Sequence, residues 1–170
     1  MQVDNIARGL HQLGVRPGDK IVLYAETQAK WLFCCLAVAK LNATLVTLYS
    51  NLGEAGVMYG MNQTKAKFVI TTEELKNNLL TYSSKVPHLR NIIYFESKCP
   101  NIQAASRAME GTVSLEESKM QVRSLGEVET IGEKITDFTF ELPDPEDIAV
   151  SGFCFAWFSC ILTLRFYFSS

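Results

Sequence analysis

Residues that could carry chemistry are few in this chain, and their spacing does not assemble a catalytic group. His11 and His88 are the two histidines of the 170-residue sequence, and neither has a nucleophile or a carboxylate at a recognisable spacing. The acidic pairs Glu73–Glu74, Glu116–Glu117 and Glu127 with Glu129 are more typical of solvated helices and loops than of acid–base catalysis. The sequence therefore predicts no catalytic residue.

The cysteines favour structural roles as well. There are five, at positions 34, 35, 99, 154 and 160. Cys34 and Cys35 are adjacent in a predicted helix, so their side chains point about a third of a turn apart and do not form a ligand pair. An odd number without CxxC spacing argues against a disulfide framework and a zinc site, and it favours a reducing compartment. We expect small core residues and no metal ligands.

The strand-to-helix turns, where parallel α/β sheets bind ligands, contain no phosphate-binding loop. Neither GxGxxG nor GxxxxGK[ST] occurs in the sequence. The turn Glu26-Thr27-Gln28 offers a carboxylate and a hydroxyl but no glycine. This composition favours a capped helix start, with Thr27 as N-cap, over a nucleotide contact. No cofactor-binding residue is predicted.

An alternation of strand and helix signals must position these groups. Residues 20–53 are typical of a βαβ unit, in which two buried parallel strands are joined by a helical crossover. The expected elements are a helix over 3–13, a strand over 20–25, a helix over 28–41, a strand over 43–48, a helix over 54–64, a strand over 68–71, a helix from a Thr71–Glu74 capping box to 82, and a strand over 91–96. This order predicts an α/β fold, a doubly wound, mostly parallel sheet with flanking helices.

The pattern weakens after residue 96. We expect an irregular surface segment over 98–120, a short helix over 124–134, and an extended linker over 138–145 that leads into a strand at 147–150. Residues 151–170 are rich in aromatic side chains, and Arg165 is their only charge. The tail is short for a membrane span and would expose an aggregation-prone surface. It allows membrane association and hydrophobic self-association.

Composition limits the partners. A formal net charge of −2, with 48% hydrophobic and 20% charged residues, is ordinary for one globular domain. Lysine and arginine are scattered among as many acids, so the chain has no basic stripe to collect phosphates. Binding to nucleic acid is not expected.

Several segments resemble one enzyme family. They are LGVRPGDKIVLYAET at 13–27, LVTLYSNLG at 45–53, AKFVITTEEL at 66–75, NIIYFES at 91–97 and PDPEDIAV at 143–150. Together they are similar to the N-terminal part of adenylate-forming (AMP-binding) enzymes, most closely the long-chain fatty acid CoA ligases (acyl-CoA synthetases). The resemblance implies a partial N-terminal ligase domain over residues 1–150 and an apolar tail outside the family pattern over 151–170.

The resemblance also implies a reaction, although not one that this segment completes. Family members convert ATP, fatty acid and CoA to acyl-CoA, AMP and diphosphate through an acyl-adenylate, with Mg²⁺, on the cytoplasmic side of the endoplasmic reticulum or mitochondrial outer membrane. In the family, the strand at 147–150 leads into a Gly-, Ser- and Thr-rich loop that ends in Pro-Lys-Gly and holds the ATP phosphates. Here aromatics follow Ser151-Gly152. The expectation is an inactive N-terminal fragment that binds no cofactor by itself.

Two other interpretations stay open at this point. One is a non-catalytic chain that binds a partner or membrane through the apolar tail. The other is an independent flavodoxin-like binding domain, which the missing phosphate signature disfavours.

Overall fold

A computed structural model describes residues 1–96, 120–141, 143–144, 147–154 and 160–165 of the chain. The elements are α1 (Gln2–Gln12), β1 (Lys20–Tyr24), α2 (Ala29–Ala39), β2 (Thr44–Leu48), α3 (Glu54–Thr64), β3 (Phe68–Thr72), α4 (Glu73–Tyr82), a 3₁₀ turn (Ser83–Lys85), β4 (Asn91–Phe95), β5 (Gln121–Ser124), α6 (Leu125–Glu133), β6 (Ile148–Cys154) and β7 (Cys160–Arg165). The expected irregular segment over 98–120 lies almost wholly outside the described residues.

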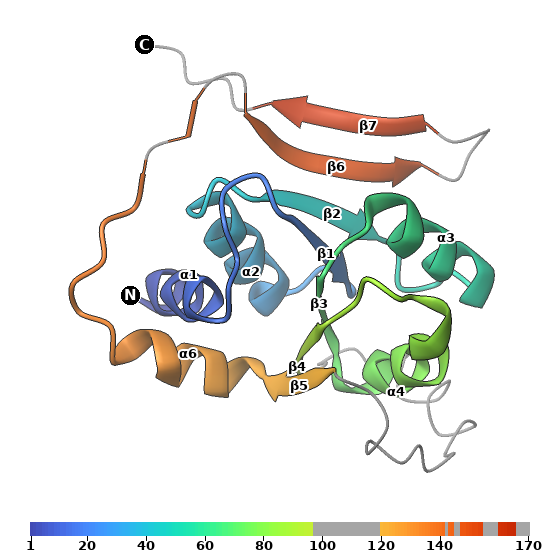
Figure 1. The fold of residues 1–170 in the computed structure, drawn as a ribbon, viewed down its shortest axis with the longest axis horizontal. Coiled ribbons are helices and arrows are strands. Elements are labelled where there is room, and N and C mark those ends of the chain that lie inside the picture. The colour runs from blue at the N-terminus through green and yellow to red at the C-terminus, as the bar shows by residue number, and fades with distance from the viewer. Residues whose placement is uncertain (97–119, 142, 145–146, 155–159, 166–170) are drawn as a thin grey trace.

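The strands form one sheet of seven, in the order β5-β4-β3-β1-β2-β6-β7 (Figure 1). Every neighbouring pair from β5 to β6 is parallel, and β7 alone runs antiparallel, against β6. β1 lies between β2 and β3, so the chain winds outward from it in both directions. The prediction of a doubly wound, mostly parallel sheet is confirmed.

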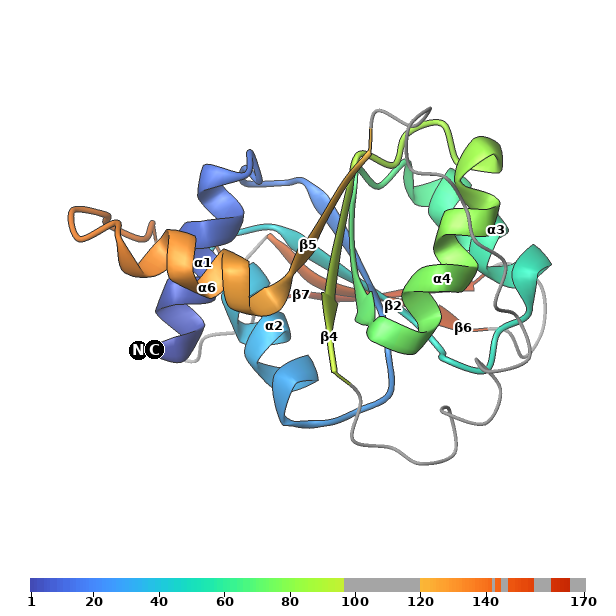
Figure 2. The ribbon, with the colours of Figure 1, turned by 90° about the horizontal axis from the view of Figure 1, so that it is seen from below.

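Helices cover both faces of this sheet (Figure 2). Ile21 and Leu23 of β1 belong to the core beneath α1, α2 and α6, whereas Val22 and Tyr24 belong to the core beneath α3 and α4. Successive side chains of a strand point to opposite faces, so a strand covered on both faces needs an uninterrupted apolar run. Each fully buried Ile or Leu contributes about 1.5–3 kcal/mol relative to exposure. The two-sided core is therefore the main source of stability.

Two predicted helix caps were wrong by one residue each. β3 continues through Thr72, and Thr72 accepts a hydrogen bond from the Leu75 amide at 3.4 Å as the N-cap of α4. Thr71 is instead buried in β3 and donates its hydroxyl to the Tyr24 carbonyl at 2.7 Å. At α2 the N-cap is Gln28 rather than Thr27, and Gln28 makes no side-chain cap bond. Strand pairing took precedence over the local capping signal at Thr71.

The C-terminal part contains more strand than the sequence indicated. The helix expected over 124–134 is present as α6, with a Ser124–Glu127 capping box. β5 was not predicted, because four residues on an outer strand carry too little alternation to stand out. Past Val150, β6 continues to Cys154 and pairs with β7. Within the described parts of the chain, no helix is both long and apolar enough to span a bilayer.

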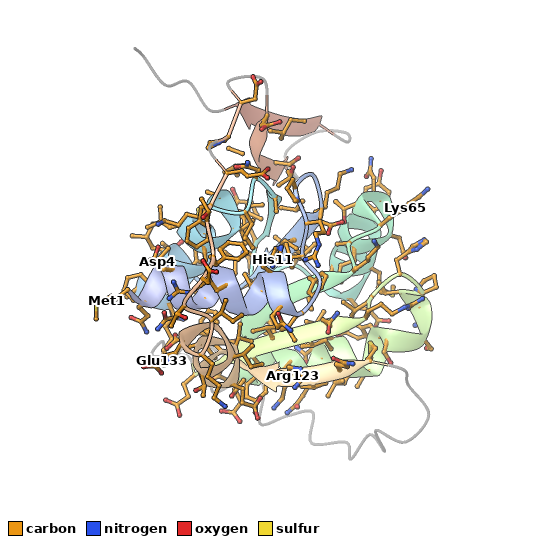
Figure 3. The ribbon with its side chains drawn as sticks, turned by 60° about the vertical axis from the view of Figure 1, so that its left-hand side comes forward. Met1, Asp4, His11, Lys65, Arg123 and Glu133 are labelled. Atoms are coloured by element: carbon orange, nitrogen blue, oxygen red, sulfur yellow. The ribbon has the colours of Figure 1, made fainter. Side chains whose placement is uncertain are left out.

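Helices α1 and α6 pack unusually closely, although they are far apart in sequence (Figure 3). A Cβ built on Gly132 would lie 1.8 Å from the Asn5 carbonyl oxygen, and one built on Gly9 would lie 2.1 Å from the Val128 carbonyl oxygen. The Arg8 Nε donates to the Gly132 carbonyl at 3.0 Å across the same contact. Only glycine permits this approach of two backbones.

We predict that Gly132→Ala destabilises the chain by about 1–3 kcal/mol, because the added methyl must push α6 away from the backbone of α1. Gly126→Ala in the same helix is the matched control. No heavy atom outside the local chain lies within 4 Å of its Cβ position. Because alanine has a higher helix propensity than glycine, Gly126→Ala should leave the stability unchanged or raise it by up to about 1 kcal/mol. Urea unfolding followed by circular dichroism checks both. Equal effects of the two substitutions would contradict the close contact.

Candidate functional site

A cavity opens at the carboxyl edge of the sheet, where β1 and β2 end. Its volume is about 580 Å³. The lining comes from the end of β2, the turns that follow β1 and β2, the first turn of α2, and one residue in the first half of β6: Ala25, Glu26, Thr27, Trp31, Thr47, Leu48, Tyr49, Ser50 and Val150. Open parallel sheets bind ligands at this edge. The cavity is therefore the candidate site.

Its polar groups are a single carboxylate and several hydroxyls. The Ser50 hydroxyl donates to the Glu26 carboxylate at 3.5 Å, which ties the turn after β1 to the turn after β2. Just beneath, the Tyr24 hydroxyl donates to the Ser50 and Leu52 carbonyls at 3.4 and 3.5 Å. Burial raises the pKa of Tyr24 to about 12, with a smaller contribution from Tyr82, so the phenol stays protonated. The arrangement can accept hydrogen bonds from a ligand through the Glu26 carboxylate, and its described lining includes no His, Cys, Lys or Arg side chain.

Only some of the candidate residues considered from the sequence line this cavity. Glu26 and Thr27 line it, as their place after the first strand suggested. His88 lies in an exposed turn. Glu73 is also exposed, and its carboxylate lies 3.9 Å from the Nζ of the partly buried Lys76. Glu74 is half-buried at the start of α4. None of these three side chains lines the cavity.

The remaining candidates have structural roles. The Glu127 carboxylate accepts from the Ser124 amide at 2.7 Å in the α6 capping box, and Glu129 accepts from the Gln2 side chain at 3.1 Å. Cys34 is fully buried, and burial strongly raises the pKa of its thiol, so it remains a protonated core residue. Glu116–Glu117 lie outside the described residues. Among the residues that are described, no group of three or more His, Cys, Asp or Glu side chains could hold a metal.

Sequence reasoning missed several cavity residues: Trp31, Thr47, Tyr49, Ser50 and Val150. Their signal was available in principle, because parallel neighbours β1 and β2 must end at the same edge, and whatever follows β2 must face whatever follows β1. Residues in the turn after the second strand are therefore as strong candidates for a ligand site as those in the turn after the first.

Comparison with known proteins identifies the family. The AMP-binding enzyme family matches residues 1–153, which is nearly the whole chain. The chain belongs to the AMP-binding enzyme family. The region that was expected from the sequence to belong to it, residues 1–150, lies inside this match.

The similar members of the family are ligases of long-chain fatty acids. Long chain acyl-CoA synthetase 8 of Arabidopsis thaliana is 27% identical over 133 residues, which cover 78% of this chain and 18% of that protein. Long-chain-fatty-acid–CoA ligase 1 of Saccharomyces cerevisiae is 34% identical over 94 residues, which cover 54% of this chain and 13% of that ligase. Long-chain-fatty-acid–CoA ligase 4 of the same yeast is 27% identical over 155 residues, which cover 85% of this chain and 22% of that ligase. The chain thus spans less than a quarter of the length of these relatives.

Solved structures share the fold of this chain. A long-chain-fatty-acid–CoA ligase from Archaeoglobus fulgidus superposes with a TM-score of 0.72 at 18% identity, over 96% of this chain and 28% of that one. An anthranilate CoA ligase solved with anthranoyl-AMP gives a TM-score of 0.66 at 19% identity, over 88% and 25%. The arrangement of strands and helices is therefore that of the family.

Enzymes of this family use ATP, Mg²⁺ and CoA in general, and the described side chains of the carboxyl-edge cavity include no cation for the phosphates of such ligands. Among the described residues, Glu26 is the only charged one that lines it, and a carboxylate repels phosphate. Phosphate sites need cationic side chains or a cluster of backbone amides. We derive no phosphate-transfer step through these residues.

His11, the second histidine considered from the sequence, lies at the opposite, amino edge of the sheet. Its ring packs against Phe138 with the centroids 4.7 Å apart, and its carbonyl accepts from Arg16 Nη1 at 2.7 Å. Burial lowers the pKa of the His11 imidazole, and the Arg16 charge lowers it further. The folded chain therefore favours the neutral ring more strongly than the unfolded chain does.

We predict a loss of stability in mild acid that depends on His11. Because the folded-state pKa is lowered, the unfolded chain takes up the proton first, and the free energy of unfolding falls as the pH drops below the ordinary histidine pKa of about 6.5. His11→Gln should flatten this dependence between about pH 7 and pH 5. The exposed His88→Gln should leave it unchanged. Urea unfolding at several pH values measures both, and an unaltered slope in His11→Gln would rule the mechanism out.

Proposed function

We propose that this chain is the sheet-forming part of a long-chain fatty acid CoA ligase. The single observation that carries the proposal is the family match over residues 1–153, together with relatives of that activity that cover up to 85% of the chain. The corresponding reaction joins a fatty acid to CoA with ATP, through an acyl-adenylate. Fatty acid and CoA are the proposed substrates of the full-length protein.

In this proposal the chain supplies scaffold rather than reacting groups. The described residues offer buried apolar strands, a single carboxylate in the carboxyl-edge cavity, and no metal cluster. Adenylate formation develops negative charge around the transferring phosphate, and donors or cations must stabilise that charge. The contribution of residues 1–153 is to hold the sheet on which such groups can be mounted.

A graft tests the scaffold role. We expect the Arabidopsis long chain acyl-CoA synthetase 8, with its matching segment replaced by residues 1–153, to form acyl-CoA from palmitate, ATP and CoA. The same graft with Gly126→Ala should stay active. The graft with Gly132→Ala should lose thermal stability and, with it, activity at elevated temperature, because the α1–α6 contact is broken.

The isolated 170-residue chain provides the complementary measurement. We expect it to support no palmitate-dependent exchange of diphosphate into ATP and no acyl-CoA formation, because its described residues lack the groups that stabilise the transferring phosphate. Turnover by the isolated chain would overturn the scaffold assignment. A graft that unfolds cooperatively yet forms no acyl-CoA would overturn the ligase assignment.

A further inference from the structure

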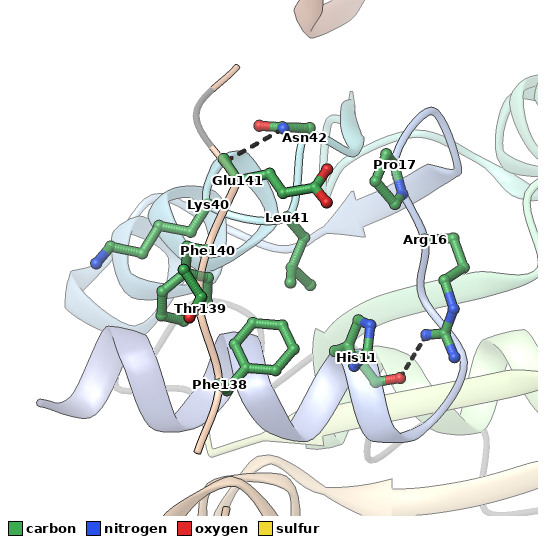
Figure 4. Close-up of a pocket in the computed structure, with 10 residues that line it drawn as sticks. All are labelled: His11, Arg16, Pro17, Lys40, Leu41, Asn42, Phe138, Thr139, Phe140 and Glu141. Atoms are coloured by element: carbon green, nitrogen blue, oxygen red, sulfur yellow. Dashed lines mark hydrogen bonds between the residues drawn. The ribbon is translucent and has the colours of Figure 1, made fainter. Parts of the chain in front are cut away.

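We propose that a second cavity, at the amino edge of the sheet, binds an aromatic α-amino acid in its zwitterionic form. Three chain segments distant in sequence converge there: the end of α1 with the turn that follows it, the end of α2, and residues 138–141 (Figure 4). The volume is about 330 Å³, within the range of small-molecule sites. Because this edge is opposite the carboxyl-edge cavity, the proposal does not depend on the ligase assignment.

The wall of the cavity is aromatic. Phe138 packs against the His11 ring at 4.7 Å between centroids, and against Phe140 at 4.9 Å in an edge-to-face arrangement. The buried Leu41 side chain and the ring of Pro17 complete the apolar lining. Aromatic side chains pack well by offset or edge contacts, so such a wall favours a flat apolar group in the ligand.

Arg16 supplies an anchor for a carboxylate. Its Nη1 donates to the His11 and Val15 carbonyls at 2.7 and 2.8 Å, and these bonds fix the guanidinium at the cavity. Within the described chain Arg16 has no ion pair with an acid, so its Nε and Nη2 donors are available for a planar anion.

Lys40 does not compete for this role. Its Nζ is 2.5 Å from the Asp4 carboxylate and lies 4.9 Å from the centroid of the Phe140 ring. The charge of Lys40 is therefore matched, and the cationic group of the cavity that lacks an acidic partner in the described residues is Arg16.

Glu141 supplies the opposite charge. Figure 4 shows its carboxylate projecting from the 138–141 segment toward Pro17, on the far side of the cavity from His11. The Glu141 carbonyl accepts from the Asn42 side chain at 3.2 Å, which fixes the backbone that carries it. An acid here repels phosphates and simple dianions but favours an ammonium group. A carboxylate for Arg16, an ammonium for Glu141 and a ring for Phe138 together describe an aromatic α-amino acid.

Calorimetric titration of the 170-residue chain with L-phenylalanine and L-tryptophan tests the site. We expect saturable binding of both. N-acetyl-L-phenylalanine lacks the ammonium, L-phenylalaninamide lacks the carboxylate, and L-cyclohexylalanine lacks the aromatic ring. Each should bind at least about tenfold more weakly, because each leaves one of the three features unmatched.

Substitutions assign the features to residues. Arg16→Gln should weaken L-phenylalanine binding about tenfold, so that L-phenylalanine no longer binds more tightly than L-phenylalaninamide. In Glu141→Gln, L-phenylalanine should no longer bind more tightly than N-acetyl-L-phenylalanine. Both side chains are exposed, so the fold should persist. Lys134→Gln, an exposed cation that does not line the cavity, is the control and should bind as the parent does. The proposal would be overturned if L-phenylalanine or L-tryptophan failed to bind at 10 mM. It would also be overturned if Arg16→Gln bound L-phenylalanine as tightly as the parent chain does.

Discussion

Burial of β1 on both faces is the constraint on which the rest of the structure depends. Ile21, Val22 and Leu23 are all fully buried, yet their side chains alternate between two cores. A strand in that position requires a helix layer on each side, and parallel neighbours require long crossovers, which are the helices themselves. The order of elements from α1 to β4 follows from this requirement.

The sequence was informative wherever that constraint produces a period. The strands from β1 to β4, and the helices from α1 to α4, were predictable because burial on one or two faces imposes a repeat of about 3.6 residues or a continuous apolar run. Caps were less predictable, since Thr71 and Thr72 are chemically equivalent neighbours. The choice between them depends on how far β3 pairs with β1 and β4, which is a tertiary property. β5 escaped prediction for the related reason that an outer, half-buried strand has no strong pattern.

The sites were harder to predict than the fold. Glu26 and Thr27 were visible as a turn after a strand, but the cavity that contains them also needs Tyr49 and Ser50 from the next turn. The amino-edge cavity was beyond reach, because it joins Arg16 to Glu141 across most of the chain. Periodicity determines which face of an element is buried, but it does not specify which loops meet at the edge of a sheet.

The α1–α6 contact links the packing of the fold to that second cavity. Gly132 near the end of α6 lies against Asn5 and Gly9 of α1, and α6 ends at Glu133, five residues before Phe138. His11, against which Phe138 packs, is on the same helix α1. The close approach along the middle of α1 therefore limits where the chain leaving α6 can meet the C-terminal end of α1. The glycines allow the close packing of α1 and α6 that positions the chain leaving α6, and the residues of the 138–141 segment set the chemistry of the aromatic wall.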